Sequence, residues 1–442
     1  MKRFYLIFIA LILALCLIPG VGLLINGPAE AGANEVGAAM PDLAERDGSL
    51  NTDCLGELAD YVNDGFYLRQ ELITGWAKLL TPLGHSAEDD VVLGRDGWLY
   101  YAPEIEGWAG VYTLGERGVY AAANNLALMQ EYVESLGADF LFTIAPDKST
   151  LYPEHLPGYP QSCAPSSAER LAAAMEELGV NYVNLFELFS AQDEVYYFEH
   201  DSHWNSRGAA LAADALNAAL GVGSSYAAGY EYETVQHTGD LFDMLYPAGT
   251  DTETNDAPTA LNFDQGANVR PDSITIDTTS DGVGSLLMFR DSFGELLYPF
   301  MAEGFASARF SRQAAYDLTT AEELSSTAVV IELVERNLSW LYEQPAVFPA
   351  PERELNLASE IEGEATLETD AALDGAHSVT GVISGNVDVD SDVYIAYNGA
   401  VYECLLTADG YTACLPGEGG GEYTLFWYSD GNLTHCDMSV NI

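Results

Sequence analysis

The stretch of sequence that decides the fold runs from Ser285 to Gly304 and reads SLLMFRDSFGELLYPFMAEG. Its first part, Ser285–Arg290, is a short apolar run that predicts a buried strand, and Phe293–Gly304 predicts a helix directly after that strand. Ser292 therefore stands at a strand-to-helix turn, where a hydroxyl is exposed above the edge of a sheet. The N–H groups at the start of such a helix are placed to stabilise an oxyanion.

The same alternation of strand and helix continues on both sides of this stretch. Apolar runs predict further strands and Ala/Leu-rich runs predict further helices, the strands at 139–145, 181–185 and 328–334 and the helices at 120–136, 166–178 and 206–220. Strands separated by helices of this length indicate βαβ units on a mostly parallel sheet. Residues 222–284, rich in Gly, Asp, Thr and Pro, are expected to form an irregular insertion. An α/β domain is thus predicted over 51–345.

The pattern changes after the proline-rich run at 345–351 (PAVFPAP). The helical period disappears, and short apolar runs between Gly and Asp turns predict strands at 378–383, 393–397, 400–406 and 422–428. We expect a proline-rich linker at 346–358, followed at 359–442 by a small all-β sandwich that is a candidate carbohydrate-binding domain.

Two cysteines of this β region are predicted to form a disulfide. Cys404 and Cys414 flank the turn residues 408–410 (ADG), which places them opposite each other on a hairpin. The pairing of Cys54, Cys163 and Cys436, an odd number, stays open.

The N-terminus predicts a membrane anchor or a signal peptide at 1–25. Lys2 and Arg3 precede Phe4–Ile25, a stretch of 22 uncharged residues that is long enough to cross a bilayer. Basic residues ahead of it and acidic ones beyond it place the bulk of the chain outside the membrane. A cleaved signal peptide is the alternative, because residues 29–31 (AEA) resemble a cleavage site. The chain is therefore expected at the cell surface or in the periplasm, tethered by the anchor through a linker at 26–50, or secreted if it is cleaved.

The composition of the chain argues against some classes of function. The 442 residues are 48% hydrophobic, and 16 Lys and Arg stand against 68 Asp and Glu, for a net charge of −52. Two or three packed domains fit this length and apolar content. So acidic a surface repels phosphate backbones, which argues against a nucleic-acid partner and disfavours long polyanionic substrates. Neutral glycans, cations and small acyl donors remain open.

Candidate catalytic residues lie at the ends of three predicted strands. Asp201 and His203 stand two apart in a loop, so the carboxylate can orient the imidazole while its other nitrogen faces a cleft. The run at 145–150 (APDKST) and the turn at Ser292 end two more strands, and loops at the carboxyl ends of such strands share one crevice. Together these motifs hold a nucleophile, a base and an orienting acid.

Each motif also has a simpler interpretation. An Asp-x-His in a loop is more often a local hydrogen bond than a catalytic pair, and an Asp-Ser after a strand is commonly a helix cap. A metal site is a further alternative, because nitrogen and oxygen ligands are available from His200, Asp201, His203 and Asp240.

The ordered set of motifs resembles a known family. The runs that carry the resemblance are 91–100 (VVLGRDGWLY), 145–149 (APDKS), 201–205 (DSHWN), 239–241 (GDL), 290–294 (RDSFG) and 330–337 (VIELVERN). Across roughly 51–342 their order and spacing are similar to the SGNH-hydrolase-like domain of alginate O-acetyltransferases and the related DHHW proteins. The resemblance implies a mostly parallel sheet flanked by helices. It also implies Ser292 as nucleophile, His203 as base and Asp201 as orienting acid.

The resemblance further implies a function. We expect an extracytoplasmic O-acetyltransferase that acts on a cell-surface or exported polysaccharide through an acetyl-serine intermediate. It would need no cofactor and no metal, and would take acetyl groups from a membrane-bound O-acyltransferase partner. The candidate substrate-binding residues are Lys148, Trp204, Arg290 and Tyr298. A polysaccharide acetylesterase and a non-catalytic glycan-binding surface protein are the alternatives.

Alginate, the acceptor of that family, is not expected to be the acceptor of this chain. A net charge of −52 is poorly suited to binding alginate, so a neutral or zwitterionic acceptor is predicted. An acidic acceptor would require a local basic cleft, for which Lys148, Arg207 and Arg290 are the candidates.

Overall fold

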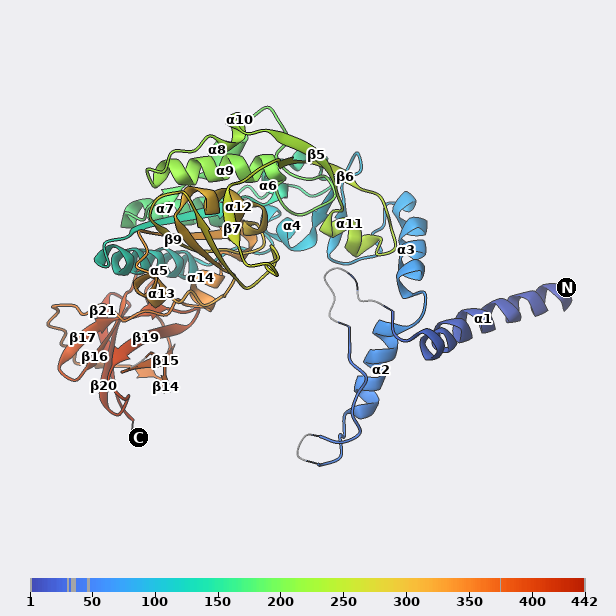
Figure 1. The fold of residues 1–442 in the computed structure, drawn as a ribbon. Coiled ribbons are helices and arrows are strands. Elements are labelled where there is room, and N and C mark those ends of the chain that lie inside the picture. Colours follow the sequence, from blue (N-terminus) through green and yellow to red (C-terminus); the bar gives the residue numbers. More distant parts are fainter. Residues whose placement is uncertain (1, 30–31, 33–36, 46–47, 374, 441–442) are drawn as a thin grey trace.

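The computed structural model describes the chain except for residues 1, 30–31, 33–36, 46–47, 374 and 441–442. Three parts follow one another along the chain in Figure 1: N-terminal helices, a central α/β body and a C-terminal region made of strands. This mixed α/β architecture with a C-terminal β region confirms the predicted fold class.

The central body is built on a seven-stranded sheet. The strands in spatial order are β4 (Tyr182–Val183), β3 (Asp139–Ala145), β11 (Ala328–Val334), β9 (Ser285–Phe289), β10 (Ser307–Ser311), β8 (Thr275–Ser280) and β7 (Phe263–Gln265). From β4 to β10 every neighbouring pair is parallel, whereas β8 and β7 continue the sheet antiparallel. The central strand β11 is buried at all seven positions (AVVIELV), as expected of a strand covered by helices on both faces.

Helices cover both faces of this sheet (Figure 1). On one face, α5 (Glu116–Ser135) and α7 (Ser167–Leu178) pack against Phe142 and Ile331 in one apolar cluster. On the other, α9 (Ser206–Ala219) and α12 (Gly294–Gly304) pack against Leu141 and Val330. Consecutive strand residues thus point to opposite faces of the sheet. The apolar runs therefore place side chains in the apolar clusters on both faces.

Helix ends follow the local sequence. Ser166 caps α7, because its hydroxyl accepts from the N–H of Glu169 at 3.1 Å. In turn, the Glu169 carboxylate accepts from the N–H of Ser166. Asn205 caps α9 by accepting from the N–H of Gly208. Such caps satisfy N–H groups that the first helical turn leaves unpaired.

Residues 222–284 are not wholly irregular, which corrects the prediction. They contribute β7 and β8 to the main sheet, and β5 (Tyr232–His237), which pairs with β6 (Glu253–Pro258) in a separate hairpin. In β8 (TIDTTS) only Ile276 and Thr278 are buried. A strand so polar on its exposed face gives no apolar run, and for that reason the composition indicated a loop.

Shorter elements complete the body. They are β1 (Val91–Leu93) paired with β2 (Leu99–Tyr101), α4 (Ala102–Trp108), α6 (Lys148–Leu151), α8 (Leu185–Ser190), α10 (Tyr226–Gly229), α11 (Asp240–Leu245), α13 (Thr319–Glu323) and α14 (Trp340–Glu343), with 3-10 turns at Thr81–Leu83, Pro153–His155 and Glu335–Asn337.

The C-terminal region forms two sheets. One contains β12 (Ile361–Glu362), β21 (Asn432–Val440), β20 (Gly421–Ser429), β16 (Val393–Tyr397) and β17 (Ala400–Glu403). The other contains β13 (Glu364–Ala365), β15 (Ala376–Ser384), β19 (Gly410–Pro416) and β18 (Leu405–Leu406), with β14 (Glu368–Ala371) also on β15.

The segment predicted as a linker, 346–358, is packed rather than free. Ala346 and Phe348 are buried, the N–H of Ala350 donates to the carbonyl of Cys414 at 2.9 Å, and Arg353 pairs with Glu131 and Glu403. Its apolar side chains belong to the same buried cluster as α5 and the β region. The β region therefore shares a core with the α/β body.

The predicted disulfide does not form. The hairpin turns through two residues, with the N–H of Thr407 donating to the carbonyl of Gly410, and Leu405 pairs with Thr412. This register sets Cys404 opposite Ala413 instead of Cys414, and both cysteines are free. A shift of one residue moves a side chain to the other face of a sheet, so a two-residue turn separates the thiols.

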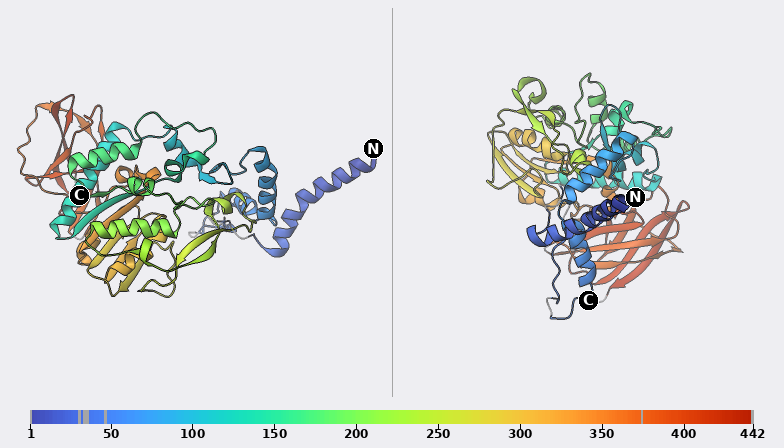
Figure 2. Two further views of the ribbon diagram at one scale, coloured as in Figure 1. Left: turned by 90° about the horizontal axis from the view of Figure 1, so that it is seen from above. Right: turned by 90° about the vertical axis from the view of Figure 1, so that its right-hand side faces the viewer.

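Of the three N-terminal helices, α1 (Lys2–Asn26) stands apart from the body, whereas α3 (Arg69–Leu80) packs against it. Helix α1 projects away from the body in Figure 1 and in the left view of Figure 2, while α2 (Cys54–Gly65) and α3 lie beside the C-terminal end of α1. Among the described residues, one helical segment, Phe4–Asn26, is long and apolar enough to cross a membrane. A signal sequence meets the same criterion, so anchor and signal peptide both stay open.

Candidate active site

Three side chains far apart in the sequence form one hydrogen-bond chain. Ser292 follows β9 and precedes α12, while Asp201 and His203 lie in the loop before α9. His203 Nε2 lies 2.9 Å from Ser292 Oγ, and His203 Nδ1 lies 2.7 Å from Asp201 Oδ1. Because a carboxylate can only accept, Nδ1 carries the proton and Nε2 is free to accept from the serine hydroxyl.

Asp201 is held by more than His203. Its Oδ2 accepts from His237 Nε2 at 2.8 Å and from the N–H of Asp240 at 3.1 Å. Burial alone would raise the pKa of Asp201, but the charges of and hydrogen bonds from His203 and His237 outweigh burial and hold the pKa well below its usual range. Asp201 is therefore a carboxylate that is held in place on both oxygens.

His203 has the opposite shift. Burial lowers its pKa, but the charge of Asp201, the hydrogen bond to it and the charge of Asp240 together raise the pKa above the usual value. Its imidazolium form is thereby stabilised, which is what a base needs once it has taken a proton.

Asp240 completes this cluster and keeps the metal alternative open. Its carboxylate accepts from the N–H and the hydroxyl of Ser202 at 2.7 and 2.6 Å, and lies 3.4 Å from His203 Nδ1. One ligand atom each from Asp201, His203 and Asp240 lie within 4.8 Å of one another. His200, the fourth predicted ligand, is not in this group, and its ring lies beside Phe242.

The triad opens into a cleft of about 770 Å³. Three arginines line this cleft, and each is paired with a carboxylate: Arg270 with Asp272 at 2.8 Å, Arg312 with Glu295 at 2.8 Å and Arg336 with Asp147 at 2.6 Å. Charges of both signs therefore surround the serine, although the whole chain is strongly acidic.

The turn that carries Ser292 is fixed by the preceding aspartate. Asp291 Oδ1 accepts from the N–H of Phe293 at 2.9 Å, and Oδ2 accepts from the N–H of Val334 at 2.8 Å. The N–H of Phe293, one of the helix-start groups expected to face an oxyanion, is thus already bonded. Glu332 lies behind the turn and accepts from the N–H of Asp291; burial, and then the charge of Asp291, raise the pKa of Glu332 well above its usual range.

The four residues predicted to bind substrate are buried, and the cleft is lined by others. Lys148 donates from Nζ to the carbonyls of Phe198, Glu199 and Asp201, at 3.3, 3.3 and 2.6 Å. Its side chain thus ties α6 to the loop that carries Asp201 and is not available to a substrate. Burial is also the main reason that its pKa is lowered.

The other three have structural contacts as well. Trp204 donates from Nε1 to the carbonyl of Phe293 at 3.0 Å, and Tyr298 donates to Gln265 at 3.2 Å. Arg290 donates to three carbonyls, those of Asp291, Pro271 and Ser273. The candidate basic cleft is also not formed by the predicted residues, since Arg207 stacks on Tyr232 and lies near Asp256.

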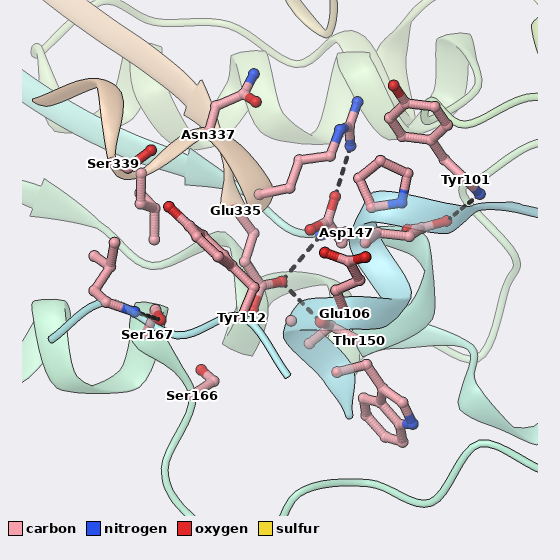
Figure 3. Close-up of a pocket in the computed structure, with 17 residues that line it drawn as sticks. Tyr101, Glu106, Tyr112, Asp147, Thr150, Ser166, Ser167, Glu335, Asn337 and Ser339 are labelled. Carbon is pink, nitrogen blue, oxygen red and sulfur yellow. Dashed lines mark hydrogen bonds and ion pairs between the residues drawn. The ribbon is translucent and has the colours of Figure 1, made fainter. Parts of the chain in front are cut away.

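A second cavity lies on the other side of Tyr101 and Arg336, which line both (Figure 3). It measures about 290 Å³ and contains the carboxyl groups of Glu104, Asp147 and Glu335. Glu335 accepts from Thr150 at 2.7 Å and from the N–H of Asp147 at 3.2 Å. Burial is the main cause that raises the pKa of Glu335 to about 7.

Two neighbours of the triad escaped the sequence reasoning. His237 is the last residue of β5, in the region expected to be irregular. It contacts Asp201 because the chain comes back beside the 201–203 loop at the end of this strand. Arg336 follows β11 in a 3-10 turn and lies in the cleft wall. The available signals were the nearness of His237 to the quoted run at 239–241 and the place of Arg336 within the quoted run at 330–337.

Comparison with known proteins finds similarity over part of the chain. Residues 91–281 match the family model described as "SGNH hydrolase-like domain, acetyltransferase AlgX". This segment includes Asp201 and His203 and ends before Ser292. A curated protein, the probable alginate O-acetylase AlgJ of Pseudomonas syringae pv. tomato, is 29% identical over 197 residues, which cover 42% of this chain and 49% of that protein. The chain thus spans about half the length of this relative.

Two solved structures are similar in fold at low sequence identity. The O-acetyltransferase domain of Pseudomonas putida AlgJ is 18% identical with a TM-score of 0.40, over 56% of this chain and 91% of that one. A DHHW family protein from Eubacterium siraeum is 16% identical with a TM-score of 0.42, over 57% and 94%. Likenesses of this degree carry no argument about activity. Residues 91–281 are thus similar to the SGNH hydrolase-like domain of an acetyltransferase, and part of the chain is similar in sequence to probable alginate O-acetylases.

Proposed function

We propose that this chain is a polysaccharide O-acetyltransferase that uses Ser292 as its nucleophile. The observation that carries the proposal is the continuous hydrogen-bond chain from Asp201 through His203 to Ser292 at the wall of an open cleft. A nucleophile, a base and an orienting acid within hydrogen-bond reach are what acyl transfer requires.

The first half-reaction acylates the serine. Ser292 Oγ attacks the carbonyl carbon of an activated acetyl ester while His203 Nε2 takes the hydroxyl proton. The tetrahedral intermediate then collapses, the bond to the donor's leaving group breaks, and that group takes the proton from His203. Asp201 stabilises the imidazolium between these two steps, and Arg336, which lines the same cleft as Ser292, is a candidate to stabilise the oxyanion.

The second half-reaction delivers the acetyl group. A sugar hydroxyl gives its proton to His203 Nε2 and attacks the acetyl-serine carbonyl, the bond to Ser292 Oγ breaks, and the serine recovers its proton. Water in place of the sugar would make the protein an acetylesterase, by the same steps. The names of the relatives, which include an alginate O-acetylase, favour transfer to a polysaccharide.

The remaining assignments belong to this proposal. The domain at 51–345 would be catalytic, and the β domain at 359–442 would contact the glycan. The acetyl group would come from a membrane-bound O-acyltransferase, and the chain would act outside the cytoplasm. We propose a neutral or zwitterionic acceptor, because the arginines of the cleft are already paired with carboxylates.

Time-resolved mass spectrometry with an activated acetyl ester tests this function. The expected result is transient acetylation of Ser292, followed by transfer to a neutral oligosaccharide faster than release to water. Ser292→Ala should show no acetylated intermediate. An active protein that never carries acetyl on Ser292 would overturn the proposal, and release to water alone would favour the esterase.

A metal-dependent hydrolase is the second candidate, favoured by the closeness of Asp201, His203 and Asp240. The two functions respond differently to chelation. With the serine mechanism, EDTA leaves the acetyl-ester activity unchanged. Loss of activity with EDTA, restored by zinc or manganese, would instead assign these three residues as ligands.

A further inference from the structure

The surface of α3 carries an unusual apolar stripe. Leu72, Trp76 and Leu79 are 42%, 55% and 61% exposed, and Leu83, just beyond the helix, is 68% exposed. At 100° per residue the three helical positions fall on one side of α3. Large apolar side chains in a continuous exposed row mark a surface that another apolar phase covers.

The opposite side of α3 is fixed to the body. Ala77 is fully buried in a cluster with Leu99 of β2 and Leu241 of α11. Thr74 accepts from the N–H of Ala248 at 2.8 Å, and the hydroxyls of Thr81 and Tyr246 lie 2.6 Å apart. The stripe is therefore not the unpacked inner face of a loose helix, and its exposure is a property of the folded body.

The stripe begins beside the segment that can cross a membrane. The N–H of Tyr67, two residues before α3, donates to the carbonyl of Pro19 in α1 at 3.2 Å, and the Tyr67 ring lies against Gly22. These contacts lie between four and seven residues before the end of α1 at Asn26. At about 1.5 Å per residue they lie on the order of 6–10 Å inside the end of that helix, so α3 begins beside the outer end of the apolar segment.

The charge of α3 fits the same surroundings. The helix (RQELITGWAKLL) contains Arg69 and Lys78 against Glu71, a formal charge of +1 in a chain of −52. An acidic body is repelled by anionic lipids, and a helix with an apolar stripe, a tryptophan and a basic residue in its last turn is suited to the bilayer surface. In Figure 1, α3 and α2 run across the end of α1, as helices lying on a bilayer spanned by α1 would.

We propose that α3 lies in the membrane interface and binds the lipid bilayer through Leu72, Trp76, Leu79 and Leu83. The buried side of this helix packs on α11, which begins at Asp240 of the catalytic cluster. Helix α3 therefore sets the height and orientation of the cleft above the bilayer. The proposal concerns a lipid contact and does not depend on the proposed chemistry.

Tryptophan fluorescence tests this contact in the full-length chain. Of the six tryptophans, α1 contains none, Trp98, Trp204 and Trp427 are buried, and Trp76 is the one whose side chain is more than one-third exposed. We would reconstitute the protein into phospholipid bilayers with plain or brominated acyl chains, because bromine quenches only tryptophans that reach the acyl region. The expected result is partial quenching of the wild type and none of Trp76→Phe.

Matched variants separate the contact from other effects. Trp108→Phe, which removes a half-buried tryptophan in the body, and Ser292→Ala should both keep the wild-type quenching. Leu72→Gln with Leu79→Gln, at exposed positions that leave the core intact, should reduce it. Equal wild-type emission in plain and brominated bilayers would overturn the proposal, and would do so whether or not the chain proves to be an acetyltransferase.

Discussion

Two clusters of buried acidic groups lie on either side of Arg336 and Tyr101, and the pKa of Asp201 in one is shifted in the opposite direction to that of Glu335 in the other. In the cleft, the pKa of Asp201 is held well below its usual range, because two imidazoles outweigh the effect of burial. In the neighbouring cavity of Figure 3, burial raises the pKa of Glu335 to about 7, because its hydrogen-bond donors among the described residues are a hydroxyl and a backbone N–H, neither of them charged.

The difference shows that the partners, and not burial, decide which acid is ionised. Asp201 carries a negative charge that can stabilise a cation on His203, so its cluster is suited to moving a proton. Glu335, whose pKa is raised to about 7, instead accepts from Thr150 of α6 and from the N–H of Asp147 just before it. We therefore expect the cleft to be catalytic and the second cavity to be structural, and the following changes test that contrast.

The largest effect is expected at the nucleophile. Ser292→Ala should lower kcat for an activated acetyl ester by on the order of 10⁴-fold or more, as should His203→Ala, since removing a nucleophile or its base disables the whole unit. Ser166→Ala in the second cavity is the matched control and should keep wild-type rates. Circular dichroism checks that each variant is folded. Comparable losses of kcat in the Ser166 and Ser292 variants would contradict the distinction between a catalytic cleft and a structural cavity.

Asp201→Asn should have the next largest effect. The amide keeps the shape but no longer stabilises the imidazolium or selects the Nδ1–H tautomer, and similar changes in triads cost about 10⁴-fold in kcat. His237→Gln, which keeps a donor near the second oxygen of Asp201, should cost only about tenfold, in line with one hydrogen bond to a charged group. Initial rates on the same ester measure both. A loss at His237 as large as that at Asp201 would assign it a more direct role.

A smaller effect is expected on the pH profile. His203 must be neutral to act as a base, so kcat/KM should fall as the pH drops through the raised pKa of this histidine. The charge of Asp240 contributes to raising that pKa, so Asp240→Asn should shift the acid limb to lower pH. A profile of kcat/KM from pH 4 to 9 would show the shift, and an acid limb that moved to higher pH would contradict this assignment.

The smallest effect on activity is expected in the second cavity. Glu335→Gln should leave kcat/KM within about twofold, because glutamine mimics the protonated acid and lies outside the cleft. Its effect should appear in stability. The folded-state pKa of about 7 exceeds the ordinary 4.5, so the folded chain binds the proton more tightly and loses stability as the pH rises from about 4.5 to 7. Denaturant midpoints across that range should fall less steeply for Glu335→Gln.

The sequence predicted the strands that are apolar on both faces and the helices that begin with a capping residue. Strands β3 and β11 end where predicted, and Ser166 marks the start of α7. Strand β10 (SARFS) was missed because only alternate positions are apolar, and β8 (TIDTTS) was missed because Ile276 is its single apolar residue. The cysteine pairing failed on a single residue of turn length, which composition does not determine.

At the site, the sequence motifs correctly identified the three residues that form the hydrogen-bond chain. The roles predicted from the motifs for the surrounding basic residues were wrong. Ser292 follows β9, as predicted, whereas Asp201 and His203 lie in the loop between α8 and α9 with no strand directly before it, and the fold brings this loop to the end of β9. Lys148 and Arg290 lie in the same motifs, but their charges are directed at backbone carbonyls inside the body. Whether a basic side chain faces a cleft or a loop depends on tertiary packing, and no spacing in the chain reveals it.

The interface of the β region with the body has a consequence for how such proteins are built. Asn125 of α5 is fully buried, donates to the carbonyls of Leu341 and Leu406, and accepts from the N–H of Leu406. Phe348 and Leu405 belong to one apolar cluster with α5. The β region is therefore not a cassette that recombination could exchange between enzymes, because a transplanted copy would present an apolar wall to water. It and the helix it covers must change together in evolution.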